Sequence, residues 1–300
     1  MRSFYLMIYV LFLASCTINN VDFTKLYDAG THAMDLGDKS LEEEIQIGDE
    51  VANTLLAQYS LSSNKSMHSY VNKVGTWLAL QTERPELTWY FAVLEDESFN
   101  AYAAPGGYVF LTTGLLAQLE SESELAGVLA HEIAHVIQRH HLMALKSKAA
   151  VGMATNLLAF GAQLYQAGRA QDNYDDSNYG EDNYEDPAYQ GQSESAMEQE
   201  QLVNSINNLY GKGLDRDDEY SADRMAVVIA ARAGYEPYAF YAVLQKLASN
   251  KGATTHLDTL LKTHPHPSDR IEQLKSIYNS PQLAQVEGLE LKKRFYQYIR

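Results

Sequence analysis

The sequence predicts an α+β fold that is predominantly helical and carries a small sheet. Two runs of β-branched and aromatic residues, 88–94 and 108–111, indicate strands, and a Pro-Gly-Gly turn at 105–107 precedes the second run. Elsewhere apolar residues recur every three to four positions, which is the period of an amphipathic helix. With 46% hydrophobic and 21% charged residues among 300, the composition is that of an ordinary globular protein.

The helices are expected in sequence along the chain. The first begins near Asp38 and has acidic residues in its early turns, and the second covers 66–82. From Thr112 the pattern is helical almost to the end, and Ser121 with Glu124 predicts a capping box at the start of a long helix. Further helices are expected over 195–210, 215–233, 237–249 and 267–278.

The net charge of −16 is concentrated in one segment. Ten acidic residues and no basic ones fall in 171–200, where tyrosines recur at five-residue intervals at Tyr174, Tyr179, Tyr184 and Tyr189. This period fits neither a helix nor a strand, and the composition cannot bury a core, so we predict a disordered insertion. Three interpretations of this insertion are a solvated spacer, a substrate-mimicking plug over a functional site, and a loop that binds a partner. The acidic balance of the chain argues against nucleic acid as a partner.

The N-terminus predicts export and lipidation. Arg2 precedes an apolar run over 4–14, which is too short for a permanent membrane span but suits a signal peptide. The residues Leu13-Ala14-Ser15-Cys16 resemble a bacterial lipobox. We therefore predict a signal peptide over 1–15 and a lipidated tether over 16–37.

Two other interpretations of the N-terminus are an ordinary signal peptide with a chance cysteine and a buried strand. Cys16 is the single cysteine, so neither an intramolecular disulfide nor a thiolate metal cluster can form. Thr17 follows it, and the resemblance to Gram-negative lipoproteins then favours the inner leaflet of the outer membrane, facing the periplasm.

The strongest chemical signal is His131-Glu132-Ile133-Ala134-His135. Residues four apart share a helix face, so both imidazoles can bind one metal ion, and Glu132 can reach a water at that ion. A pair of surface histidines is the alternative. It fits poorly, because apolar residues surround the motif and buried ionisable groups need a partner.

A catalytic zinc ion needs a third protein ligand and an open position. Glu219 and Asp223 are again four residues apart, so Glu219 can bind the metal while Asp223 accepts a hydrogen bond from a ligand histidine. The alternative is a solvated, acid-rich helix start that compensates the helix dipole.

A third cluster contains His264, His266 and Arg270, with prolines at 265 and 267 that hold an extended loop before a helix. An imidazole or guanidinium there can stabilise an oxyanion or occupy the open metal position. An exposed helix-entry loop explains the same residues equally well.

These motifs, in this order, resemble the HtpX/CAAX prenyl protease-type gluzincin metallopeptidase family. The segment 100–109 also resembles that family's lead into its active-site edge strand. The resemblance spans 38–280, leaves 281–300 as a C-terminal tail, and implies a zincin-type metallopeptidase domain whose small sheet has an edge strand flanking the active-site helix. No membrane-spanning pattern flanks the motif helix, so the chain resembles the periplasmic LoiP/BepA-like branch, here without a C-terminal repeat domain. The lipobox favours the LoiP-like lipoproteins within that branch.

The resemblance also implies roles for residues. One Zn²⁺ would be held by His131, His135 and Glu219, with Glu132 as general base. His264, or in its place His266, would gate the metal in a resting state. Substrate backbone would add as a strand beside four residues, namely Gly107, Tyr108, Val109 and Phe110.

The expected function is a zinc-dependent metalloendopeptidase that hydrolyses unfolded or misassembled cell-envelope proteins. One alternative is an envelope chaperone or outer-membrane assembly scaffold whose protease site is latched. Another is a zinc hydrolase that acts on a non-peptide bond. The expected partners are unfolded protein substrates, a membrane reached through the lipid on Cys16, and the outer-membrane assembly machinery.

Overall fold

The computed structural model describes residues 17–18, 21–22, 41–84, 86–147, 202–249 and 254–299. The predicted signal peptide, Cys16 and the acidic insertion over 171–200 lie outside these residues. Within the predicted tether, strand β1 (Thr17–Ile18) pairs antiparallel with β2 (Val21–Asp22). No helix in the described part of the chain is long and apolar enough to cross a membrane.

The main sheet has three strands in the order β3-β5-β4. Strand β3 (Tyr90–Leu94) runs parallel to β5 (Tyr108–Thr112), and β4 (Ala101–Ala104) pairs with β5 antiparallel. The turn η2 (Pro105–Gly107) joins β4 to β5. Its glycines adopt positive φ angles, and at Gly107 an added Cβ atom would lie 2.7 Å from the carbonyl oxygen of Thr88. The turn therefore requires glycine.

Helices make up most of the described chain, so the α+β, predominantly helical class is confirmed. Two further stretches, 140–147 and 202–212, are also helical. The helices that the structure delimits are α3 (Leu41–Gln58), α4 (Lys65–Ala79), α5 (Thr113–Gln118), α6 (Glu122–Ile137), α9 (Arg216–Arg232), α10 (Ala239–Ser249), α11 (Thr254–Thr263), α12 (Pro267–Tyr278) and α13 (Lys292–Ile299), with a short η3 (Leu283–Gln285).

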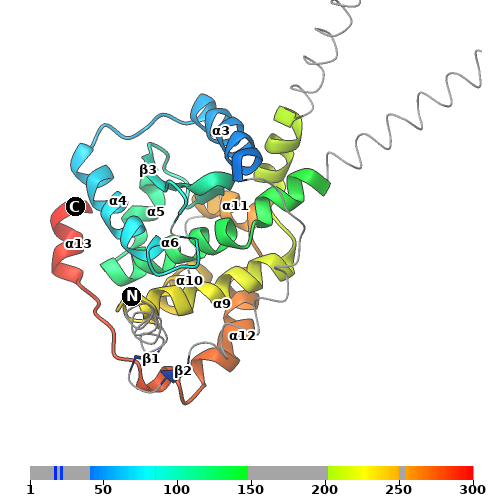
Figure 1. Cartoon of the computed structure of the whole chain (residues 1–300). Coiled ribbons are helices and arrows are strands. Elements are labelled where there is room, and N and C mark those ends of the chain that lie inside the picture. The colour runs from blue at the N-terminus through cyan, green and yellow to red at the C-terminus, as the bar shows by residue number, and fades with distance from the viewer. Residues whose placement is uncertain are drawn as a thin grey trace, which may run out of the picture.

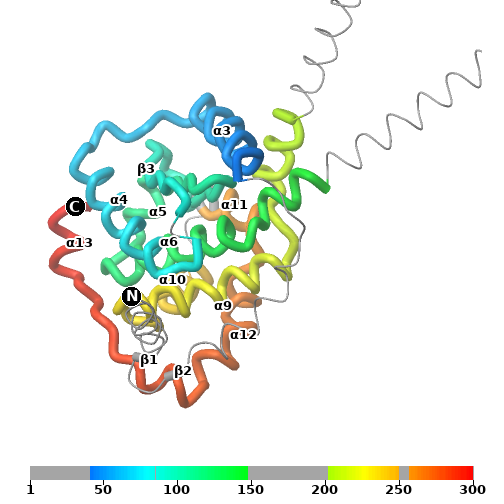
Figure 2. Tube along the Cα trace, in the orientation of Figure 1, coloured from blue at the N-terminus to red at the C-terminus, as the bar shows by residue number. Residues whose placement is uncertain are grey.

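Helix α6 runs through the middle of the molecule (Figure 1). The sheet and α4 pack on one side of it, and α9 and α10 pack on the other (Figure 2). Every residue of α6 is consequently buried. Its N-terminus is capped by the Ser121 hydroxyl, which accepts the Glu124 N–H at 3.1 Å. The Glu124 carboxylate accepts the N–H of Glu120 rather than that of Ser121, so the predicted capping box is shifted by one residue.

The segment expected to be a C-terminal tail folds onto the domain. Phe295 of α13 is fully buried, and its ring lies 6.5 Å from that of Tyr70 on α4. This segment therefore belongs to the core and closes one side of the molecule.

Candidate metal centre and active site

Helix α6 places His131, Glu132 and His135 in the protein interior. The Nε2 atoms of the two histidines lie 3.1 Å apart. Behind them, the ring of Phe240 on α10 stacks on His131 at 5.6 Å. This close approach requires Gly127, because a Cβ atom there would lie 2.8 Å from Phe240 Cβ. The packing of α10 thus fixes one imidazole from behind.

Helix α9 brings the third group to the same point. The Glu219 oxygens lie 3.7 Å from His131 Nε2 and 3.6 Å from His135 Nε2. His264, which follows α11, places its Nε2 3.7 Å from Glu219 Oε2. One ligand atom from each of these four residues lies within 4.8 Å of the others.

This set of atoms fits a zinc ion. Two imidazoles and a carboxylate are the ligands of catalytic zinc sites. Glu219 Oε2 is also buried without a hydrogen-bond partner among the described residues, and such a group is costly unless a cation or donor satisfies it. The structure thus brings His131, His135 and Glu219 together as the sequence predicted.

A buried ion pair holds the first histidine. Asp223 Oδ1 lies 2.9 Å from His131 Nδ1, so the neutral imidazole carries its proton on Nδ1 and has its free lone pair on Nε2. Arg270 Nε donates to Asp223 Oδ2 at 2.9 Å, and its Nη2 donates to Oδ1 at 2.5 Å. Two nitrogens of Arg270 are thus engaged by Asp223, and its expected role as an oxyanion donor stays a prediction.

The second histidine is held by a residue that the sequence reasoning missed. His135 Nδ1 lies 3.0 Å from His140 Nδ1, and His140 Nε2 lies 3.7 Å from Asp218 Oδ1. With His135 as the donor and His140 as the acceptor, His135 Nε2 is again left free for a metal ion. Arg139 adopts a left-handed backbone with φ of 58°, which interrupts the helix between α6 and the helical stretch 140–147 and allows His140 to contact His135. The pair of adjacent histidines at 140 and 141, close after the metal-binding motif, was the sequence signal that could have indicated this role.

Burial sets the protonation of several groups in the site. It raises the pKa of Glu132 to about 7. It lowers the pKa of His135 well below its usual value and that of His264 to about 4. Burial and Arg270 act to lower the pKa of His131, but Asp223 and Glu219 outweigh them and raise it to about 9.

His266 lies apart from the cluster. Its side chain is exposed, and its Nδ1 accepts the Ser268 N–H at 3.2 Å as the cap of α12. Of the two histidines left open by the sequence, His264 is the one that faces Glu219.

The expected substrate-binding strand was wrong. β5 is the central strand and pairs on both sides, so Tyr108, Val109 and Phe110 offer no free edge for strand addition. Gly107 lies in the preceding turn, and the Tyr108 hydroxyl is held by Asp49 at 2.5 Å. The sequence predicted two strands near this point, but not that β5 forms a hairpin with β4 and also pairs with β3.

The strand that borders the site is β4. The Thr112 N–H donates to the Asn100 carbonyl at 3.1 Å, so by alternation the polar backbone groups of Ala101 and Ala103 point away from β5. The Ala103 carbonyl accepts the Tyr210 hydroxyl at 2.6 Å. An edge strand therefore flanks α6, as the fold class predicted, but a tyrosine occupies one of its acceptors.

The site is closed in this structure. A cavity of about 20 Å³ lies between β4, Glu132, Glu219, His264 and Tyr210. That volume accommodates about one water molecule. A polypeptide can enter only after one of these walls moves.

Known proteins resemble this chain over most of its length. The β-barrel assembly-enhancing protease of Yersinia pestis is 27% identical over 245 residues, which cover 80% of this chain and 45% of that protein. The mitochondrial metalloendopeptidase OMA1 of Schizosaccharomyces pombe is 23% identical over 241 residues, 79% of this chain and 62% of that protein. A protease HtpX homologue of Streptococcus equi subsp. equi is 29% identical over 209 residues, 61% of this chain and 65% of that protein.

The chain thus spans less than half the length of the first of these relatives. The model of peptidase family M48 matches residues 64–278, a stretch that contains all four clustered side chains. Because the match covers more than half of the sequence, the chain belongs to peptidase family M48, whose metalloproteases are zinc-dependent.

Proposed function

We propose that the chain is a zinc-dependent metalloendopeptidase that cleaves unfolded or misassembled proteins of the cell envelope. The observation that carries the proposal is the convergence of His131, His135 and Glu219 beside the buried carboxyl of Glu132. In this site, zinc would polarise the scissile carbonyl and lower the pKa of a water molecule.

The chain's own residues would supply the proton transfers. With a pKa near 7, Glu132 can take a proton from water and pass it to the leaving amine, since neither form is strongly favoured at neutral pH. Asp223 and His140 would keep the two ligand imidazoles in the tautomer that leaves Nε2 free.

The substrate would bind as an added strand beside β4. Ala101 and Ala103 present their backbone groups on the side of the metal cluster, and strand addition requires an extended partner. Extended segments are exposed in unfolded proteins, which supports a role in quality control over the cutting of folded proteins.

The test is hydrolysis of unfolded casein by the zinc-loaded protein. Glu132→Gln removes the base and keeps the ligands, so we expect the rate to fall by about 10²–10⁴-fold. A chelator should abolish cleavage. Glu95→Gln, at an exposed acid, is the matched control and should cleave normally. Unchanged cleavage by Glu132→Gln would overturn the proposal.

A second candidate is an assembly scaffold whose protease site is latched. It is favoured by His264 in the ligand cluster and by the small cavity at Glu132. If His264 is a latch, His264→Ala should cleave casein several-fold faster than the unchanged protein at equal zinc content. If Glu132→Gln restores cells that lack the protein, the scaffold role is the important one.

We further propose that the protein is periplasmic and anchored to the outer membrane by a lipid on Cys16. The lipobox-like residues supply the support, and one relative is named for β-barrel assembly, which suggests the assembly machinery as a partner. Mass spectrometry of the membrane-bound protein should find acyl chains on Cys16. Cys16→Ser should release the protein from the membrane, and retention of that variant would contradict the anchor.

A further inference from the structure

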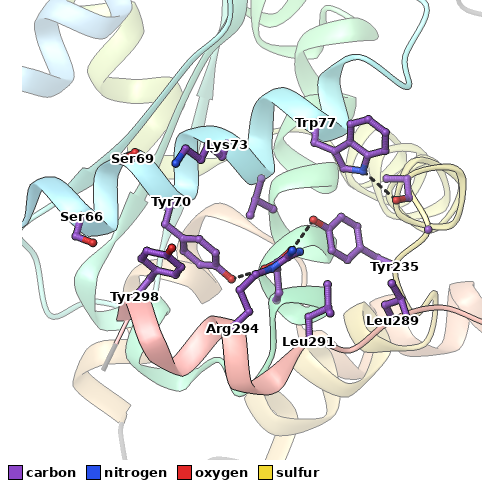
Figure 3. Close-up of a pocket in the computed structure, with 14 residues that line it drawn as sticks. Ser66, Ser69, Tyr70, Lys73, Trp77, Tyr235, Leu289, Leu291, Arg294 and Tyr298 are labelled. Atoms are coloured by element: carbon purple, nitrogen blue, oxygen red, sulfur yellow. Dashed lines mark hydrogen bonds and ion pairs between the residues drawn. The ribbon is translucent and has the colours of Figure 1, made fainter.

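A larger cavity lies at the opposite end of α6 from the metal cluster. Its volume is about 590 Å³, within the range of small-molecule binding sites. Residues from α4 form one edge and the C-terminal segment forms the other (Figure 3). Glu122, on the cavity wall, precedes His131 by nine residues, or roughly 13 Å of helix. The cavity is thus separate from the catalytic centre.

The floor of the cavity is a carboxylate whose oxygens both accept hydrogen bonds from neighbouring side chains. Glu122 is fully buried and accepts hydroxyl hydrogen bonds from Tyr70 at 2.7 Å and Tyr235 at 2.8 Å. Arg294 donates to both of its oxygens. Burial and Glu122 raise the pKa of both phenols, so they remain donors. The Glu122 charge is therefore fully compensated, and the floor is rigid.

The walls are aromatic and partly open to solvent. Tyr298 stacks on Tyr70 with ring centres 4.7 Å apart. Trp77 is 48% exposed and is held by a 2.9 Å hydrogen bond from its Nε1 to the Ala233 carbonyl, and Leu289 is 62% exposed. Large apolar side chains fixed around a hollow are typical of a ligand site.

One cation at the rim has no ion-pair partner among the described residues. Lys73 lies on α4 between Ser69 and Trp77, and it forms no ion pair with any residue that the structure describes. Since Arg294 and Glu122 neutralise one another, Lys73 gives the cavity a net positive charge in a protein of net charge −16. An anion of the ligand would be attracted to this point.

We propose that this cavity binds an apolar carboxylate, with the apolar part between the aromatic walls and the carboxylate at Lys73. A polypeptide C-terminus that ends in a large apolar residue has this chemistry, and so does a fatty acid. The proposal does not depend on proteolytic activity.

Trp77 reports on the cavity directly. The chain has two tryptophans, so Trp89→Phe in the full chain leaves Trp77 as the single indole. The probes are acetyl-Ala-Phe with a free carboxylate, its C-terminal amide, decanoate and decanol. We expect a saturable change in fluorescence with at least one carboxylate, and binding of its uncharged counterpart about fivefold weaker. The carboxylate that binds shows whether the cavity takes a polypeptide C-terminus or a fatty acid.

Variants separate the cavity from general effects. Lys73→Met should weaken carboxylate binding about fivefold and leave the uncharged probe unchanged, whereas Lys73→Arg should retain it. Lys65→Met, on the same helix but outside the cavity, is the matched control. Ser69→Trp should fill the cavity and prevent binding. No saturable binding by calorimetry or fluorescence, or equal binding of acid and uncharged probes, would overturn the proposal.

Discussion

Near each end of α6 lies a buried carboxylate, Asp223 of α9 or Glu122 of α6, that binds an arginine from a later helix. At the metal end, Arg270 of α12 binds Asp223; at the other end, Arg294 of α13 binds Glu122. The surroundings differ. The Arg270 side chain is 4% exposed, whereas the Arg294 side chain is 51% exposed and lines the cavity of about 590 Å³.

This difference suggests different roles for similar pairs. A fully buried ion pair costs desolvation of both charges, so it is weak evidence for a stabilising purpose. Asp223 instead fixes the His131 tautomer, which accounts for a charge at that point. Glu122 touches no candidate ligand atom and organises the floor of an open cavity.

The largest expected effects come from removing each arginine, which tests the difference between the two ion pairs directly. Arg270→Met leaves Asp223 buried with the His131 imidazole as its remaining partner, and we expect a loss of about 3–5 kcal/mol in the free energy of unfolding. Arg294→Met leaves Glu122 with two phenol donors, so we expect a loss of about 1–2 kcal/mol. Urea denaturation in the presence of a chelator measures both without a contribution from metal binding.

Equal losses for the two variants would contradict the assigned difference in environment. A second contrast checks the roles. Arg270→Met should also weaken zinc binding, whereas Arg294→Met should not, because the Glu122 network lies apart from the metal cluster.

The next largest effect is expected at His140. His140→Ala removes the acceptor that orients His135, so zinc affinity should fall about 10–100-fold. Competition with a chromophoric chelator measures it. His140→Gln keeps an acceptor and should recover part of the loss. His266→Ala, at an exposed cap, is the control that should bind zinc normally. Normal zinc affinity in His140→Ala would show that His140 does not orient His135 for metal binding.

Much of the candidate site was predictable because its geometry is local. Residues four apart on a helix share a face, which is why His131 with His135, and Glu219 with Asp223, could be paired from the sequence. His140 was not predictable in the same way, because it contacts His135 only through the interruption of the helix at Arg139.

The strand order shows the same limit. Two strand runs could be recognised, but composition does not say that β5 lies between β3 and β4, since this depends on pairing across the sheet. Glu44 is a further case. It was expected only as one of the acidic residues in the early turns of the first helix, yet it is buried and paired with Arg84 and Arg139, 40 and 95 residues further along the chain.

The smallest predicted effect concerns the covered edge of β4. Tyr210→Phe removes the hydroxyl that occupies the Ala103 carbonyl, so a substrate strand no longer competes with it. One hydrogen bond contributes about 1 kcal/mol, so KM for an extended peptide should fall about fivefold with little change in kcat. Tyr59→Phe is the matched control, because the Tyr59 hydroxyl bonds the Tyr102 side chain and not the strand backbone. If Tyr210→Phe changes kcat instead, or if both variants behave alike, then the Tyr210 hydroxyl does not guard the edge, and His264 alone would account for the closed site.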